Sequence, residues 1–311
     1  MTGMIALVTG VACGQNYPVR PVRIVTAEAG GGPDFAARLI SQGLTANLGQ
    51  QVIVENRGGS VAIMAELVAK SSPDGYTLLF PASTFWLAPY MQEKLPYDPL
   101  RDFAPITQAT STPTILVVNP ALAAGTVQEL IALAKAKPGS LGYASGPAGS
   151  TSHLAAELFK AMGGVNLLRI PYKGTGPALT DLIGGQVQVM FPNAASAAPH
   201  VKSGRLTALA ITSSRRSALY PDLPTVAASG LPGYEAVAIF GLFAPAQTPA
   251  SLVNRLNRET VRALNQADVK EKFFNAGVET VGSTPQEFAN TVKSEMARLG
   301  KLIRDAGIRD E

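Results

Sequence analysis

The sequence has few of the residues on which most enzyme chemistry depends. Its 311 residues include one cysteine, Cys13, and two histidines, His153 and His200. One cysteine cannot build a disulfide framework or a cysteine-based metal site, and no HExxH motif or Asp-rich cluster accompanies the histidines. A GxSxG nucleophile elbow and a phosphate-binding GKS/T loop are also missing. We therefore expect no metal, no cofactor and no catalytic residue.

Charge is scarce as well, and this limits the partners. Only 15% of the residues are charged, the net charge is +4, and the densest basic segment is the pair Arg215 and Arg216. Nucleic-acid binding requires clustered lysine and arginine side chains, so a nucleic-acid partner is not expected. With 46% hydrophobic residues, the chain can instead build the cores of two domains of ordinary size.

The N-terminus carries an apolar run, Met4–Ala12, which is too short to span a bilayer. Small residues at Ala12 and Gly14 favour cleavage by a signal peptidase after Gly14, so residues 1–14 are expected to be a signal peptide for export to the periplasm. This peptide is atypical because Met1–Gly3 carries no basic side chain. A lipid attached to Cys13 and a cytosolic N-terminus are the alternatives.

Beyond the N-terminus, apolar runs typical of strands alternate with amphipathic segments typical of helices. This alternation predicts an α/β fold with parallel strands and right-handed crossovers. Strands are expected at 22–27, 52–54, 76–80, 114–118, 141–144, 167–171, 187–191, 206–211 and 236–243, with a packed irregular segment over 89–105. Capping sequences at Thr126 and Thr284 predict two of the helix starts.

Loops rich in Gly, Ser, Thr or Asn follow several predicted strands. Ligands of α/β sheets bind at loops that leave the carboxyl ends of strands, which nominates segments 28–34, 82–86, 145–153, 172–176 and 192–196. The central segment is Tyr143–His153, where glycines and hydroxyls precede an amphipathic helix that Ser150, Thr151 or Ser152 can cap. Free N–H groups at a helix start attract anions. The segment therefore either holds a carboxylate or a phosphate, or is an ordinary capped turn.

Three single residues near these loops allow two interpretations each. His153 could orient a ligand or act as a base, or it could pack and cap locally at its helix start. Lys173 could be a counter-ion for the ligand or an ordinary loop lysine. Trp86, the only tryptophan, could form an apolar wall of the site or fill the packing between domains.

A series of short motifs runs in a fixed order along nearly the whole chain. The motifs are YPVRPVRIV at 17–25, GGGPD at 30–34, VENR at 54–57, AKSSPDGYTL at 69–78, LPYDP at 95–99, DFAP at 102–105, YASGPAGSTSH at 143–153, IPYKG at 170–174, ALTDLIGGQ at 178–186, LPTV at 223–226 and GLPGY at 230–234. In this order they resemble the extracytoplasmic solute-binding receptors of tripartite tricarboxylate transporters, the Bug or TctC family.

The resemblance implies a type 2 periplasmic-binding-protein fold, in which two α/β domains clamp a ligand in the cleft between them. One domain would comprise residues 15–118 and 236–311, and the other residues 119–235. The chain would cross between them near Val118–Pro120 and near Glu235–Pro245, and both crossings would act as hinges. We expect a monomer that delivers a small organic acid to the membrane subunits of a tripartite tricarboxylate transporter.

In this family, main-chain N–H groups, hydroxyls and bridging waters from the inter-domain loops hold the carboxylate. Carried over to this sequence, the resemblance implies ligand-binding residues in two opposed walls and a flank. They are Gly30, Gly31, Gly32 and Asp34, with Ser83 and Thr84 nearby; then Ser145, Gly149, Ser150 and Thr151; and beside these Tyr172, Thr175 and Asn193.

Departures from the family pattern narrow the expected ligand. Glu28 would repel a highly charged acid such as citrate, and Pro192 replaces an aspartate that could meet a ligand ammonium. Phe85 and Trp86 would leave room for an aromatic carboxylate. The expected ligand is therefore a mono- or dicarboxylate, aromatic acids included. The alternatives are an enzyme with His153 and Lys173 as acid and base, and a periplasmic carboxylate sensor.

Overall fold

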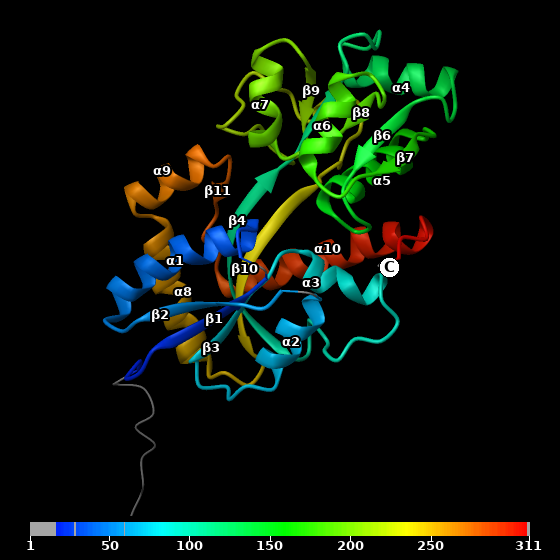
Figure 1. The fold of residues 1–311 in the computed structure, drawn as a ribbon. Helices are drawn as coiled ribbons and strands as arrows, with labels where there is room; N and C mark the ends of the chain where they lie inside the picture. Colours follow the sequence, from blue (N-terminus) through cyan, green and yellow to red (C-terminus); the bar gives the residue numbers. More distant parts are fainter. Residues whose placement is uncertain (1–16, 28, 59, 310–311) are drawn as a thin grey trace, which may run out of the picture.

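The computed structural model describes residues 17–27, 29–58 and 60–309 and arranges them in two lobes, each built on one mixed β-sheet (Figure 1). The expected signal peptide, Cys13 and Glu28 lie outside the described residues. Within the described part of the chain, no helix is both long and apolar enough to cross a membrane.

The first lobe contains a six-stranded sheet with the strand order β11-β4-β10-β3-β1-β2. Strand β1 is parallel to β2 and β3, whereas β10 is antiparallel to β3 and β4. The strands are β1 Val22–Thr26, β2 Val52–Asn56, β3 Thr77–Phe80, β4 Phe103–Pro113, β10 Val237–Pro245 and β11 Glu279–Thr280. The helices are α1 Gly32–Leu48, α2 Val61–Ala69, α3 Thr84–Leu87, the 3-10 turn Ala88–Tyr90, α8 Ala250–Leu264, α9 Ala267–Asn275 and α10 Pro285–Asp305.

The second lobe contains a five-stranded sheet with the order β7-β6-β8-β5-β9. Strand β6 is parallel to β7 and β8, whereas β5 is antiparallel to β8 and β9. The strands are β5 Ile115–Val118, β6 Gly142–Ser145, β7 Leu168–Pro171, β8 Val189–Met190 and β9 Thr207–Ile211. The helices are α4 Val127–Ala136, α5 Thr151–Gly163, α6 Thr175–Ile183 and α7 Ala194–Lys202; a 3-10 turn at Ala227–Ser229 follows β9.

Both sheets contain the expected parallel strands, and both are mixed because antiparallel strands join them. In the first lobe β10 and β11 run opposite to β1, and in the second lobe β5 runs opposite to β6. Strand β4 was not expected, because Pro105 and Pro113 interrupt its polar, threonine-rich sequence. The long strands β4 and β10 pair with each other and lead the chain toward and away from the second lobe (Figure 1).

The two crossings between the lobes lie next to each other. The first is at Thr114, between β4 and β5, and not near Val118–Pro120, because Ile115–Val118 pairs with strands of the second lobe. The second precedes β10, at the start of the expected segment. Thr212 connects the two, since its hydroxyl donates to the Thr114 carbonyl at 2.8 Å and its own carbonyl accepts from the Ala236 N–H at 2.9 Å.

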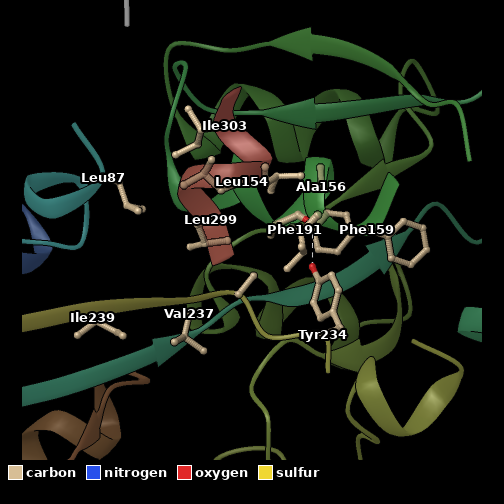
Figure 2. Packing of buried hydrophobic residues seen from close by; sticks show 14 of the residues in the cluster. Leu87, Leu154, Ala156, Phe159, Phe191, Tyr234, Val237, Ile239, Leu299 and Ile303 are labelled. Carbon is tan, nitrogen blue, oxygen red and sulfur yellow. Dashed lines mark hydrogen bonds between the residues drawn. The ribbon is translucent and has the colours of Figure 1, made fainter. Parts of the chain in front are cut away.

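On one side of the molecule the lobes share an apolar core (Figure 2). Leu299 and Ile303 of α10, in the first lobe, lie beside Leu154 of α5, in the second. Tyr234 is fully buried at the second crossing and its hydroxyl donates to the Ala155 carbonyl at 2.8 Å. The start of α5, which carries the central loop of the sequence analysis, is therefore supported from behind by α10.

Trp86 belongs to this core and not to a ligand wall. Its fully buried ring lies 6.1 Å from that of Phe243 and 5.9 Å from that of Phe288, between ring centroids. Phe85 is equally buried and stacks on Tyr97 at 5.0 Å. The expectation that Phe85 and Trp86 leave room for an aromatic ligand is wrong, because neighbouring rings of the same lobe fill that space.

Candidate functional site

The cleft between the lobes consists of two adjoining cavities that share Pro147 and Ser150 of the second lobe. The larger has a volume of about 780 Å³ and the smaller of about 270 Å³. The larger is lined mainly by the first lobe, and Ala148 extends the second-lobe wall. The smaller lies within the second lobe and against the crossing strands. The two cavities together are the inter-lobe cleft.

The first wall of the cleft is the segment from Gly30 to Asp34, which follows β1 and includes the first residues of α1. Gly30 adopts a φ of 83° and donates its N–H to Asp34 Oδ2 at 2.9 Å. Asp34 Oδ1 accepts from Asn56 Nδ2 at 2.8 Å and pairs with Arg38 Nε at 2.9 Å. Burial alone would raise the pKa of Asp34, but the hydrogen bonds from Arg38, Gly30 and Asn56 outweigh it and hold that pKa below its ordinary value. Asp34, only 4% exposed, positions the loop and does not line the cleft.

Gly31 and Gly32 form the exposed surface of this wall. The N-terminus of α1 approaches β10 so closely that a Cβ on Gly32 would lie 2.9 Å from Phe240 Cζ. A glycine here therefore lets the start of the helix, with its N–H groups, pack directly against β10, the strand that follows the second crossing.

The opposite wall is the loop from Gly146 to Thr151, between β6 and α5. Ser150 is the N-cap of α5 and its hydroxyl accepts from the His153 N–H, which confirms one of the three expected caps. Gly149 adopts a φ of 72° and donates its N–H to His153 Nδ1 at 3.1 Å. A Cβ on Gly149 would lie 2.3 Å from the sulfur of Met91, in the first lobe. The two lobes thus lie close together at Gly149 and Met91.

His153 holds this loop as a neutral acceptor. Burial, followed by the nearby charge of Arg169, lowers its pKa to about 4, against a smaller opposite effect of Glu157. The imidazole is 4% exposed and lines neither cavity. Of its two interpretations, local packing and capping is the one that the geometry supports.

Arg169 supports the same loop from the neighbouring strand, and the sequence analysis missed it. Its Nε donates to Ser145 Oγ at 3.0 Å and its Nη2 to the Gly146 carbonyl at 3.1 Å. Ser145 is fully buried, so its hydroxyl serves this contact and does not reach the cleft. The pairing of β6 with β7, which places Tyr143 opposite Arg169, could be recognised only once the sheet order is known.

The remaining expected residues also divide into those that line a cavity and those that do not. Thr84, Thr151, Thr175 and Asn193 line one of the cavities. Ser83 is buried beneath the surface, and Lys173 lines neither cavity. The Tyr172 hydroxyl donates to Asp181 Oδ2 at 2.8 Å, away from the cleft; burial, and then this bond, raise the pKa of Tyr172 to about 12.

The structure thus brings seven of the expected residues to the cleft surface and places six behind it. The surface residues are Gly31, Gly32, Thr84, Ser150, Thr151, Thr175 and Asn193, and those behind are Gly30, Asp34, Ser83, Ser145, Gly149 and Tyr172.

The cleft also contains one cation that the sequence analysis did not select. Arg57 follows β2, lines the larger cavity next to Ser60, and has a 48% exposed side chain. It is the only charged residue among the described residues that line either cavity. The rule that ligands bind at carboxyl ends of strands applies to β2 as well, and could have found it.

Two α/β lobes joined by two adjacent crossings, with a cleft of small polar loops between them, define the class of two-lobed solute-binding proteins. The chain belongs to the tripartite tricarboxylate transporter family receptors, whose family model matches residues 36–308.

Several known proteins are similar to the chain over nearly its full length. Protein BugT of Bordetella pertussis is 37% identical, and the alignment covers 99% of this chain and 96% of BugT. The structure of R. palustris Rpa4515 with adipate is 35% identical, with a TM-score of 0.77 and coverage of 94% of this chain and 99% of that one. MatC from Rhodopseudomonas palustris, with bound malate, is 32% identical, with a TM-score of 0.74 and coverage of 92% and 100%. These similarities confirm the expected family and fold.

Proposed function

We propose that the protein is an extracytoplasmic receptor that captures a small organic carboxylate in the inter-lobe cleft. One observation carries this proposal: the described residues that line the cleft offer hydroxyls, helix N-termini and one arginine, and none of them is acidic. Such a surface favours an anion. The relatives with bound adipate and malate support a carboxylate over other anions.

The ligand would be held by the seven expected residues that reach the cleft surface. Thr151 and Ser152 begin α5, and within the described part of the chain their N–H groups find no acceptor. Together with the Thr151 hydroxyl they would bind one carboxylate, opposite Gly31 and Gly32. Neutral donors bind an anion without a permanent ion pair, which keeps release possible.

We propose that the lobes are the two domains, with boundaries at the crossings. The first would comprise residues 15–113 and 237–311, and the second residues 115–234, so that the expected boundary at residue 118 moves to Thr114. Closure would bend the chain at Thr114 and Ala236, which Thr212 connects, while the shared core of α5 and α10 stays packed.

The location, the oligomeric state and the partner of the protein are proposed from its family. The mature protein would begin after Gly14 in the periplasm, act as a monomer and deliver its acid to the membrane subunits of a tripartite tricarboxylate transporter. An enzyme in the same cleft would need an acid or base at its surface, and neither His153 nor Lys173 lines it. A receptor that returns its ligand unchanged fits the cleft better.

Native mass spectrometry of the protein as purified from the periplasm tests this function. We expect an adduct with the mass of a small organic acid, released unchanged on denaturation, and thermal stabilisation of the emptied protein by members of a mono- and dicarboxylate panel. A protein that no acid of the panel stabilises, or a chemically altered acid in the released fraction, would contradict the proposal.

A further inference from the structure

One end of the inter-lobe cleft is cationic and the other is neutral. Arg57 provides the only charge among the described lining residues, at the first-lobe end. At the second-lobe end the polar groups are neutral and include the hydroxyls of Ser150, Thr151 and Thr175 and the amide of Asn193. An anionic group would therefore bind a charged donor at the first-lobe end and neutral donors at the second-lobe end.

The sheet fixes the place of Arg57. Its backbone N–H donates to the Thr26 carbonyl at 2.8 Å and so extends the pairing of β1 with β2 by one residue. Its side chain is held by Glu55, whose Oε1 accepts from Nε at 2.6 Å and lies 2.5 Å from Nη2. Both contacts use one side of the guanidinium, so with respect to the described residues Nη1 and its two N–H groups remain for another acceptor.

Among the described residues, the charge around Arg57 is not balanced. Glu55 Oε2 also accepts from Arg23 Nη1, at 3.0 Å, so two guanidinium groups share one carboxylate. The group Arg23, Glu55 and Arg57 carries a net charge of +1, because one negative charge meets two positive charges. Of its two arginines, only Arg57 lines the cleft. An anionic group of the ligand would complete the balance with charge-assisted hydrogen bonds.

We propose that Arg57 forms a second carboxylate subsite, so that the receptor selects dicarboxylates over monocarboxylates. This inference rests on the proposed function, which supplies the first carboxylate at the start of α5. The second carboxylate reaches across the larger cavity to the free side of the Arg57 guanidinium. A monocarboxylate leaves that guanidinium without this partner, and a tricarboxylate has a third charge for which the described residues offer no cation.

Calorimetric titration with matched acids tests the subsite. The probes are pairs of equal carbon number, succinate with butanoate, adipate with hexanoate and suberate with octanoate. The wild type is expected to bind the dicarboxylate of at least one pair at least tenfold more tightly. Arg57→Gln should weaken that dicarboxylate by about tenfold or more and the monocarboxylate by less than about threefold. Arg57→Lys should keep part of the preference.

Arg23→Gln is the matched control. It removes the same charge from the same group of three residues but leaves the Arg57 guanidinium in the cleft, so most of the preference should remain if direct contact with Arg57 is the cause. Equal weakening of both acids by Arg57→Gln, or a wild type that binds both members of every pair alike, would overturn the subsite and leave carboxylate capture standing. Failure of every acid to bind would overturn both.

Discussion

The two loops that face each other across the cleft have the same hydrogen-bond pattern, but the side chains that accept the bond differ. In each, a glycine in the left-handed region donates its N–H to a buried side chain four residues later, in the first turn of the following helix. Gly30 donates to the carboxylate of Asp34, and Gly149 to the imidazole of His153. Each loop is thereby fixed by the helix that it precedes, before any ligand arrives.

The difference between the loops lies in charge. Asp34 is ionised and paired with Arg38, whereas a pKa lowered to about 4 keeps His153 neutral at ordinary pH. Neither loop therefore carries a net charge from these groups: the charge of Asp34 is paired with that of Arg38, and burial keeps His153 uncharged. The comparison shows that a charged and a neutral acceptor can each hold such a loop. Among the described residues that line the cleft, Arg57 is the only charged one.

Alanine substitutions at the two glycines should have the largest effect on acid binding and should affect the two loops differently. Gly149→Ala combines a strained φ with a Cβ 2.3 Å from Met91 Sδ, whereas Gly30→Ala meets no atom within 4 Å and carries only the strain, about 1–2 kcal/mol. We expect Gly149→Ala to weaken acid binding by about tenfold or more, and Gly30→Ala to do so much less. Met91→Ala, added to Gly149→Ala, should recover part of the affinity by calorimetry. Equal effects of the two glycine variants would contradict the role of the Met91 contact.

Asp34→Asn tests the charged loop. At neutral pH it should lower the free energy of unfolding by about 1.5–3 kcal/mol, because it loses charge-assisted hydrogen bonds in a buried position. The folded-state pKa of Asp34 is depressed, so its contribution is present above the ordinary pKa of 3.8 and is lost as pH falls through the folded value. Urea denaturation should therefore show a deficit that shrinks below pH 3.8. A deficit that does not change with pH would show that charge is not the cause.

His153→Gln tests the neutral loop through its pH dependence. The folded-state pKa is about 4 and the ordinary value is 6.5, so between them the unfolded chain gains a proton that the native imidazole does not take. The wild-type free energy of unfolding should therefore fall as the pH drops through this window. A shift of one pKa unit corresponds to about 1.4 kcal/mol, and we expect a smaller total loss than the full shift would give, of about 1–2 kcal/mol. The glutamine variant lacks this loss and can still accept the Gly149 N–H, so its acid binding at neutral pH should persist. Parallel pH–stability curves would refute a buried neutral imidazole.

Arg38→Gln should have the smallest effect. The Arg38 side chain is 52% exposed, and its pair with Asp34 is therefore worth less than about 1 kcal/mol. The Gly30 N–H and the Asn56 amide would still hold the carboxylate. If denaturation gave a loss as large as that of Asp34→Asn, the ion pair and not the loop hydrogen bond would fix the first wall.

Much of the fold could be predicted from local patterns. The order of strands and helices, the N-cap at Ser150 and the capping box of Thr284 with Glu287 all depend on neighbouring residues. Strand β4 could not be predicted in this way, because it depends on pairing with β10. The crossing at Thr114 could not be predicted either, because it depends on β5 joining the second sheet.

The loops that line the cleft could be predicted, but not which of their side chains face it. Composition cannot tell whether a polar side chain faces the cleft or turns back to hold its own loop. Asp34 and Ser145 turn back, as the contacts with Arg38 and Arg169 show. Arg57 was missed because the loop after β2 has no hydroxyl-rich signature, although the sheet places it at the same edge.

The central claim is that the start of α5 grips a carboxylate between the two loops. Thr151→Val tests it most directly, because Thr151 lines the cleft while Ser150 provides the helix cap, so binding can change without loss of the helix start. Calorimetric titration of the best-bound dicarboxylate should give one saturable site in the wild type and about tenfold weaker binding in the variant, the loss of one hydrogen bond to a charged group. Unchanged affinity in a folded variant would contradict the account.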